Sequence, residues 1–278
     1  MGLALVAVKR HNDRMSNAAE DPHAVAAPSA RGRWRGWLRS GGRILLDAAY
    51  PPQCVACRQI TAEPDTLCAR CWREMPFIAR PFCERLGTPF AVDIGGPLLS
   101  PAAIADPPVF GRARSVAAYD GAAQALVHKL KYSDRQELAL AMGGMMTAAA
   151  AELLQQASVI VPVPLHWTRL WQRRFNQAMA LATVIGEKSG LPVEPMLLRR
   201  RKRTLRQVGL TRAQRQANLQ GAFVVPDESK AALKGQHVLL VDDVMTTSST
   251  ANAAARILLK QGAAAVDIVT FARVVRLS

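Results

Sequence analysis

The chain is short of acidic residues, aromatic residues and long apolar segments. Its 278 residues include 21 aspartates and glutamates against 36 lysines and arginines, a formal net charge of +15, and 5% are aromatic. No stretch reaches the roughly 18 apolar residues of a transmembrane helix, and charged residues, not a small-residue cleavage site, follow the apolar start Met1–Val8. We therefore expect a globular, cytoplasmic protein with no signal peptide and no membrane span, whose positive charge favours polyanionic partners.

Cysteine is absent outside residues 54–83. Four of the five cysteines form two C-x-x-C units, namely Cys54 with Cys57 and Cys68 with Cys71. Thiolates at this spacing close a tetrahedral site, and disulfides are not expected in a cytoplasmic protein. The pattern therefore predicts structural Zn²⁺. Cys83 is left over; we expect a buried or idle thiol, and the alternative is that it replaces one of the four ligands.

Positive charge gathers in a run that contains no acidic residue. Residues 199–215 include Arg199, Arg200, Arg201, Lys202, Arg203, Arg206, Arg212 and Arg215. A field of one sign favours nucleic acid or a pyrophosphate-bearing small molecule, so the run is a candidate binding patch. The alternative is solvated surface charge with no partner, which explains the arginines between residues 31 and 43 better than it explains this run.

Two adjacent carboxylates follow an apolar run near the C-terminus. Val238–Val241 is predicted to be a buried strand, and Asp242 and Asp243 come directly after it. A loop rich in hydroxyl residues follows, and a helix is predicted from Ala251. Ligands of open α/β sheets bind at the carboxyl ends of strands, and the start of a helix offers N–H donors to a phosphate. Carboxylates repel phosphate, so we assign the two aspartates to sugar hydroxyls, directly or through a divalent cation.

Two other interpretations compete with this sugar-phosphate site. An aspartate at a helix entry often caps the helix, but a single cap leaves the second carboxylate unexplained. A nucleotide site of the P-loop type also ends a strand in aspartate, but it needs a G-x-x-x-x-G-K-[ST] segment. The sequence contains no such segment, so this alternative is weak.

Strands and helices alternate along the rest of the chain. The predicted strands are 116–119, 159–161, 222–225 and 266–271, and the predicted helices are 121–131, 136–156, 167–188 and 251–260. Pro162 and Pro164 cannot sit in a central ladder, so the chain leaves the sheet there and exposes backbone N–H groups that can receive a diphosphate. This alternation predicts a mostly parallel α/β sheet.

Several motifs together resemble one known family. They are the acidic segment with Thr246–Thr250, Val161–His166, Arg173–Ala178, Asn218–Phe223 and the paired C-x-x-C units. They resemble the competence protein F (ComF) family, which joins a zinc finger to a type I phosphoribosyltransferase domain. The resemblance implies an α/β phosphoribosyltransferase fold with a small N-terminal zinc-finger module that has four cysteine ligands. The expected boundaries are a flexible basic tail at 1–45, a double zinc ribbon-like module at 46–95 and the phosphoribosyltransferase domain at 110–278.

The resemblance also implies a ligand and a set of roles. The ligand is phosphoribosyl pyrophosphate (PRPP) with Mg²⁺. Its phosphates are assigned to Thr246, Thr247, Ser248, Ser249, Thr250, Val163, Pro164, Leu165, Asn176 and Gln177. The catalytic residues are Asp242, Asp243, Lys129 and Arg212, with Lys131 beside Lys129 as a further pyrophosphate contact; both lysines also suit the C-terminal end of a helix dipole. Ser248 and Arg174 stand where the family motifs have glycine.

Two functions follow from these expectations. The first is an enzyme that transfers a phosphoribosyl group to a nitrogenous acceptor, with the basic segment 197–223 closing over PRPP. The second is a non-catalytic accessory protein that binds single-stranded DNA through the basic run. The family is linked to DNA uptake and natural transformation, which also implies a helicase-type partner of the uptake machinery.

Overall fold

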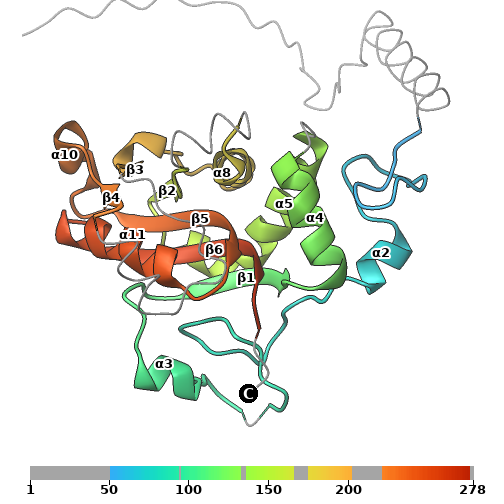
Figure 1. Ribbon diagram of the computed structural model, residues 1–278, viewed down its shortest axis with the longest axis horizontal. Coiled ribbons are helices and arrows are strands. Elements are labelled where there is room, and N and C mark those ends of the chain that lie inside the picture. The colour runs from blue at the N-terminus through green and yellow to red at the C-terminus, as the bar shows by residue number, and fades with distance from the viewer. Residues whose placement is uncertain (1–50, 94, 133–135, 166–174, 202–220, 276–278) are drawn as a thin grey trace, which may run out of the picture. The chain divides into compact units, whose positions relative to one another are not determined.

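The computed structural model describes residues 51–93, 95–132, 136–165, 175–201 and 221–275 (Figure 1). The chain divides into two compact units, Met1–Tyr50 and Pro51–Ser278, and only the second contains described residues. Within the described ranges, no helix has the length and apolar character needed to cross a membrane. The predictions that lie outside the described residues concern the tail at 1–45, His166, Arg173, Arg174, Lys202, Arg203, Arg206, Arg212 and Arg215.

A parallel sheet of four strands forms the centre of the fold. Its order is β1 (Ala113–Ala118), β6 (Ala265–Arg273), β5 (His237–Met245) and β2 (Val159–Pro162), and every neighbouring pair is parallel. The apolar run Val238–Val241 has no exposed surface, because it lies in the central strand β5 and is covered on both faces. A separate antiparallel pair joins β3 (Arg199–Arg200) to β4 (Phe223–Val224). The predicted α/β fold with a parallel sheet is confirmed.

Helices cover both faces of this sheet. Leu239 and Val241 pack with α4 (Gly121–Tyr132), α5 (Gln136–Ala149) and α8 (Gln177–Ser189), whereas Val238 and Leu240 pack with α11 (Ser249–Lys260). This division follows from the two-residue period of a strand, which sends alternate side chains to opposite faces. The remaining short elements are α6 (Ala151–Leu154), the 3-10 helices η1 (Pro195–Leu197) and η2 (Asp227–Ser229), and α10 (Lys230–Leu233).

Two predicted helices differ from the observed ones. The predicted helix 136–156 is interrupted at Ala150, whose ψ of 10° departs from helical geometry and separates α5 from α6. The predicted helix 167–188 contains α8, which begins at Gln177. Asn176 has an extended backbone and its side-chain oxygen accepts a hydrogen bond from Ala178 N at 3.1 Å, so it caps the helix. A capping residue lies outside the helix it caps, which fixes the start of α8.

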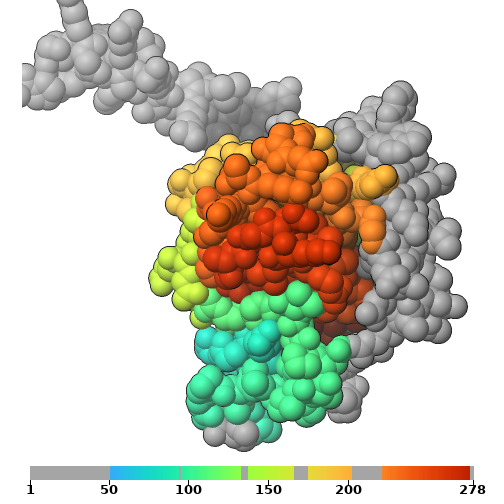
Figure 2. All heavy atoms as spheres, turned by 90° about the vertical axis from the view of Figure 1, so that its left-hand side faces the viewer, coloured from blue at the N-terminus to red at the C-terminus, as the bar shows by residue number. Residues whose placement is uncertain are grey.

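Residues 51–110 contain little regular structure and lie against the edge of the sheet. They include α2 (Ala69–Arg73) and α3 (Pro101–Ala105), and α3 lies between the expected zinc ribbon-like module at 46–95 and the expected domain at 110–278. Ile78 N donates to Val116 O and Ala118 N donates to Pro76 O, both at 2.9 Å, so this segment pairs with the exposed edge of β1. In Figure 2 its atoms (teal to green) lie directly below the last elements of the chain (red).

Candidate functional site

The acidic pair lies inside β5 instead of after it. The parallel pairing with β6 continues through Asp242 opposite Thr270 and Met245 opposite Arg273, so the strand ends four residues later than predicted. The prediction was wrong here because ladder hydrogen bonds to β6 keep polar residues in an extended conformation. The two neighbouring carboxylates lie close together, because Asp243 acts on Asp242 both by charge repulsion and through a side-chain hydrogen bond.

Asp243 is paired with a lysine of α4. The Lys131 ammonium lies 2.8 Å from Asp243 Oδ2, and both side chains are mostly buried. Lys131 therefore neutralises one of the two carboxylates. The other lysine of this helix end, Lys129, donates from Nζ to the carbonyl oxygen of Ala56, which lies between Cys54 and Cys57. The C-terminal turn of α4 thus contacts both the acidic pair and the cysteine loop.

Asp242 lines a pocket at the carboxyl end of the sheet. Its burial, followed by repulsion from Asp243, raises the pKa of this carboxyl to about 8. The Asp243 N–H donates to Asp242 Oδ1 at 2.9 Å, which opposes the shift but does not cancel it. Burial and the repulsion from Asp243 both disfavour the charged form of this carboxyl relative to an exposed aspartate.

The loop after β5 turns sharply at Ser248. This residue has φ of 57° and ψ of 3°, the left-handed conformation that favours glycine, and it precedes the first residue of α11. Its hydroxyl donates to Met245 Sδ at 3.3 Å, and the hydroxyls of Thr247 and Ser249 lie 3.0 Å apart. Ser248 makes no side-chain capping bond to α11. The helix begins at Ser249, two residues before the predicted start.

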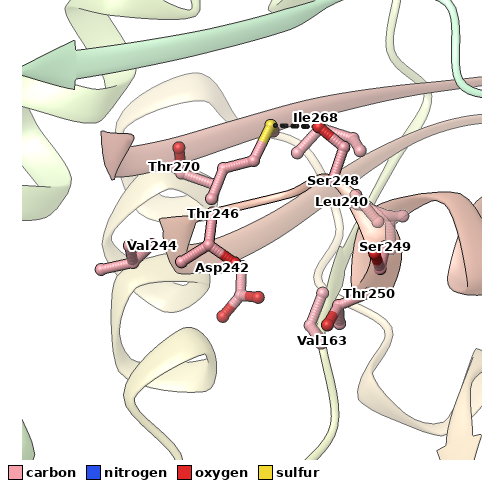
Figure 3. Close-up of a pocket in the computed structure, with 12 residues that line it drawn as sticks. Val163, Leu240, Asp242, Val244, Thr246, Ser248, Ser249, Thr250, Ile268 and Thr270 are labelled. Carbon is pink, nitrogen blue, oxygen red and sulfur yellow. Dashed lines mark hydrogen bonds between the residues drawn. The ribbon is translucent and has the colours of Figure 1, made fainter. Parts of the chain in front are cut away.

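The pocket itself lies at the carboxyl ends of β2, β5 and β6 (Figure 3). Val163 and Thr250 stand at one end of it and Thr270 at the other. Its lining residues are Val163, Leu240, Asp242, Val244, Met245, Thr246, Ser248, Ser249, Thr250, Ala251, Ile268 and Thr270. The sequence therefore predicted six of the lining residues: Val163, Asp242, Thr246, Ser248, Ser249 and Thr250.

The other predicted ligand contacts have different surroundings. Thr247, Pro164 and Leu165 are not among the lining residues. Asn176 caps α8, and its amide nitrogen also donates to Val163 O at 3.4 Å, which ties the loop after β2 to that helix. Gln177 is buried. Thr270 was missed because its place beside Asp242 depends on the strand register; its hydroxyl shares a 2.7 Å hydrogen bond with Ser115.

Three residues of the predicted basic patch are described. Arg199 lies 3.3 Å from Glu228 in an exposed ion pair. The guanidinium carbon of Arg200 stands 5.3 Å from the centroid of the Phe223 ring, and Arg201 N donates to Ala222 O at 2.8 Å. These contacts belong to the small β3–β4 pair, so part of the predicted patch is held on a defined antiparallel ladder.

The four predicted zinc ligands form one cluster. The Sγ atoms of Cys54, Cys57, Cys68 and Cys71 all lie within 4.8 Å of one another. Cys54 Sγ accepts the Cys68 N–H at 3.3 Å; burial raises the pKa of this thiol, but backbone donors outweigh burial and lower it to about 6. Burial raises the pKa of Cys71. Four close sulfur donors with N–H support fit a structural zinc site, in which all positions are filled by the protein.

The fold and these two sites define a class: a phosphoribosyltransferase domain preceded by a zinc ribbon module. A family model described as "Double zinc ribbon domain" matches residues 45–102, and one described as "Phosphoribosyl transferase domain" matches residues 178–275. The chain is 30% identical over 231 residues to the DNA utilization protein YhgH of Escherichia coli (strain K12), which covers 81% of this chain and 92% of that protein. It is 27% identical over 230 residues to competence protein F of Haemophilus influenzae, and this match covers 80% of this chain and 96% of that protein.

The chain belongs to the ComF family of these proteins, which confirms the resemblance predicted from the motifs. Among solved structures, an allosteric regulatory enzyme of purine biosynthesis is 19% identical, with a TM-score of 0.36 over 52% of this chain and 30% of that chain. The exact domain boundaries and the roles of individual site residues stay predictions.

Proposed function

We propose that this protein binds PRPP or a related phosphoribosyl ligand with Mg²⁺ in the pocket beside Asp242. The observation that carries the proposal is a single arrangement: a carboxyl group, a left-handed turn and a helix start without a capping side chain, all facing one pocket at the end of a parallel sheet. Each part suits one part of a phosphoribosyl group.

The phosphate end of the ligand fits the start of α11. This helix has 12 residues and no side-chain cap at Ser248, so its first N–H groups and its dipole favour an anion. The hydroxyls of Thr246, Ser249 and Thr250 line the same pocket and add donors. The 5′-phosphate is therefore assigned to this end, with the diphosphate toward Val163.

The ribose end fits Asp242. A carboxyl that faces the pocket can hold the ribose 2′- and 3′-hydroxyls and stabilise the positive charge that develops as the bond from C1 to pyrophosphate loosens. Asp243, whose carboxylate pairs with Lys131 and lies close to that of Asp242, is assigned to the same hydroxyls. Because the ribose occupies the two aspartates, Mg²⁺ would take most of its oxygen ligands from the diphosphate and water, as this ion commonly does.

The biological setting is proposed from the relatives and the charge. Two relatives are named a DNA utilization protein and competence protein F, which supports a role linked to DNA uptake. A cytoplasmic location and a helicase-type partner belong to the same proposal. A second candidate function is favoured by Ser248, whose side chain occupies a position suited to glycine. In this alternative the pocket binds a phosphate-bearing ligand without turnover, and the basic run at 199–215 binds single-stranded DNA.

Calorimetric titration with PRPP and Mg²⁺ tests the proposed ligand. Asp242→Asn should weaken binding by about 10- to 100-fold, the value of a lost hydrogen bond to a charged group. Asp227→Asn is the matched control, because this aspartate is exposed and belongs to η2; its variant should bind as the wild type does. Equal binding by both variants, or none by the wild type, would contradict the proposal.

Two further measurements separate the functions. Pyrophosphate release with a panel of nucleobases, dependent on Asp242, supports transfer; binding without release supports the non-catalytic alternative. For DNA, the affinity for a single-stranded oligonucleotide should fall steeply with salt, and the slope should flatten when Arg199, Arg200 and Arg201 are replaced by alanine. An unchanged slope in that variant would exclude these arginines from the DNA contact.

A further inference from the structure

The family match to a double zinc ribbon covers residues 45–102, and we infer that its second ribbon, residues 81–106, folds without a metal ion. The segment with the four-cysteine cluster, residues 52–74, is here called the first ribbon, and residues 81–106 the second ribbon. Two observations support this inference. The two segments have matching backbone hydrogen bonds, and the side chains at the four ligand positions of the second ribbon do not suit a metal ion.

The first half of each ribbon has the same turn. In the first ribbon, Cys54 N donates to Gln59 O at 2.7 Å and Arg58 N donates to Cys54 O at 2.9 Å. Around them, Thr61 N donates to Pro52 O at 2.9 Å. Arg58 lies in the left-handed region, with φ of 66°.

The second ribbon repeats these bonds 29 positions later, from Cys54 to Cys83. Cys83 N donates to Thr88 O at 2.8 Å and Gly87 N donates to Cys83 O at 2.6 Å, and Gly87 has φ of 65°. The outer bond recurs as well, from Phe90 N to Pro81 O at 2.9 Å. Leu86 therefore stands at the position of the ligand Cys57.

The second half of each ribbon is the start of a short helix. Cys68 precedes α2 and its sulfur accepts the Cys71 N–H at 3.5 Å; Ser100 precedes α3 and its hydroxyl oxygen accepts the Ala103 N–H at 3.3 Å. Ser100 and Ala103 therefore correspond to the ligands Cys68 and Cys71.

The two halves are joined in the same way. Cys68 N donates to Cys54 Sγ at 3.3 Å, and Ser100 N donates to Cys83 Sγ at 3.2 Å. The backbone bond from Val55 N to Thr66 O, at 3.1 Å, recurs from Glu84 N to Leu98 O at 2.9 Å. The agreement extends over both halves and the link between them, so it describes one fold repeated.

The ligand positions of the second ribbon no longer suit a metal. Leu86 and Ala103 have no donor atom, which leaves one thiol and one hydroxyl where zinc takes four protein ligands. Instead, Cys83 Sγ accepts hydrogen bonds from Leu86 N at 3.4 Å and from the Ser100 hydroxyl at 3.3 Å, in addition to Ser100 N. Cys83 is fully buried. Burial would raise the pKa of its thiol, but donors from Ser100, Leu86 and Arg85 outweigh burial and lower it.

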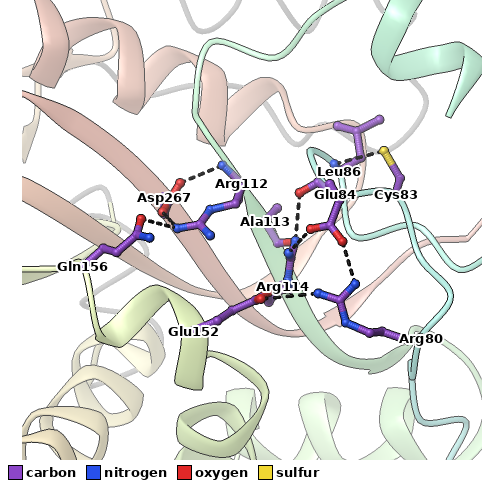
Figure 4. Close-up of polar contacts among 10 residues, drawn as sticks. All are labelled: Arg80, Cys83, Glu84, Leu86, Arg112, Ala113, Arg114, Glu152, Gln156 and Asp267. Carbon is purple, nitrogen blue, oxygen red and sulfur yellow. Dashed lines mark hydrogen bonds and ion pairs between the residues drawn. The ribbon is translucent and has the colours of Figure 1, made fainter. Parts of the chain in front are cut away.

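Contacts with the sheet supply the rigidity that a metal would otherwise give (Figure 4). Arg114 of β1 donates to Glu84 O at 2.9 Å and pairs with the Glu84 carboxylate at 2.7 Å. Arg85 donates from Nη2 to the carbonyl oxygens of Pro108 and Phe110, both at 2.9 Å, and Ala113 N donates to Arg85 O at 2.9 Å. The two residues after Cys83 are thus fixed by the domain that the ribbon covers.

The test is the zinc content of the purified protein, measured by elemental analysis per chain. The wild type should hold one ion, and Cys83→Ala should still hold one. The triple variant Leu86→Cys/Ser100→Cys/Ala103→Cys completes the second set of four thiols and should hold two. Adding Cys54→Ser and Cys57→Ser to the triple variant should return the content to one and thereby assign the new ion to the second ribbon.

Each outcome decides the inference. Two ions in the wild type would overturn it, as would loss of zinc from Cys83→Ala, which would make Cys83 a ligand of the first site. A triple variant that keeps the circular dichroism of the wild type but holds one ion would also overturn it. If the triple variant does not fold, the wild type and Cys83→Ala still decide whether the second ribbon carries metal.

Discussion

The first and second ribbons share a backbone pattern but are held by different forces. In the first, four thiols surround one metal position, and its ion pair Arg70–Glu74 is exposed to solvent. In the second, Arg114 is 3% exposed and bridges Glu84 and Glu152 across the edge of the sheet. A ribbon is too small to build a core of its own, so it needs either a metal or a larger neighbour. The two ribbons of this chain therefore have the same turn geometry, but the first is stabilised by a metal and the second by the neighbouring sheet.

Arg58 and Gly87, which occupy the same position in the two ribbons, also show how differently the ribbons contact the sheet. Both ribbons require a left-handed residue there, and the first uses Arg58 whereas the second uses Gly87. A Cβ on Gly87 would lie 2.4 Å from the carbonyl oxygen of Ala113 in β1. The sheet approaches the second ribbon so closely that a side chain does not fit, while the corresponding side chain of the first ribbon, Arg58, is exposed.

Zinc removal should produce the largest difference in local stability between the two ribbons. Structural zinc contributes about 10–16 kcal/mol of binding free energy at pH 7 in small zinc-dependent folds. After chelation, hydrogen exchange at residues 54–74 should therefore lose protection by roughly a hundredfold or more, whereas exchange at residues 83–106 should change little. Equal loss in both segments would show that the second ribbon depends on the metal after all.

Loss of Arg114 should affect the second ribbon and the sheet edge. Arg114→Leu leaves Glu84 without its buried partner, and breaking such a pair costs about 3–5 kcal/mol; we expect the lower end, because Glu152 is 39% exposed and regains water. Urea unfolding measures the change. Arg70→Leu is the matched control in the first ribbon and should change stability by less than about 1 kcal/mol, as for exposed pairs.

A methyl group at Gly87 should disturb the docking of the second ribbon. Gly87→Ala combines the left-handed strain, about 1–2 kcal/mol, with the clash against Ala113 O, so we expect a loss of about 2 kcal/mol or more in the free energy of unfolding. Gly95→Ala is the control, because Gly95 also has a positive φ, 82°, but its Cβ would meet nothing within 4 Å. A larger loss in Gly95→Ala than in Gly87→Ala would contradict close docking.

The smallest expected effect is the pH dependence of Glu84. Burial would raise the pKa of this carboxyl, but Arg80 and Arg114 outweigh burial and lower it. Its contribution is therefore present above the unfolded pKa of about 4.3 and is lost as pH falls through the lower folded value. The difference in stability between wild type and Glu84→Gln should be constant near pH 7 and shrink below about pH 4. A difference that grows on acidification would reverse the assigned sign.

Local patterns predicted the parallel sheet, the zinc cluster and half of the pocket, because each depends on residues close in sequence. The contacts that complete the site come from elsewhere: Thr270 lies beside Asp242 through strand register, and the Lys131 pairing needs α4 to pack on β5. The second ribbon was predicted only as part of a double zinc ribbon-like module at 46–95. Its turn halves are spaced differently from those of the first, and three of its four ligand positions no longer contain cysteine, so the hydrogen bonds are needed to match these positions to the ligands of the first ribbon.

The left-handed turn at Ser248 has a consequence for how the pocket meets an anion. The hydroxyl bond to Met245 and the start of α11 fix this turn through contacts within the chain. A serine also has fewer backbone conformations to lose than a glycine would. A preorganised loop spends less conformational entropy on binding than one that the ligand must order. Ser248, which stands where the family motif has glycine, therefore adds local backbone strain but lowers the conformational entropy that the loop loses when an anion binds.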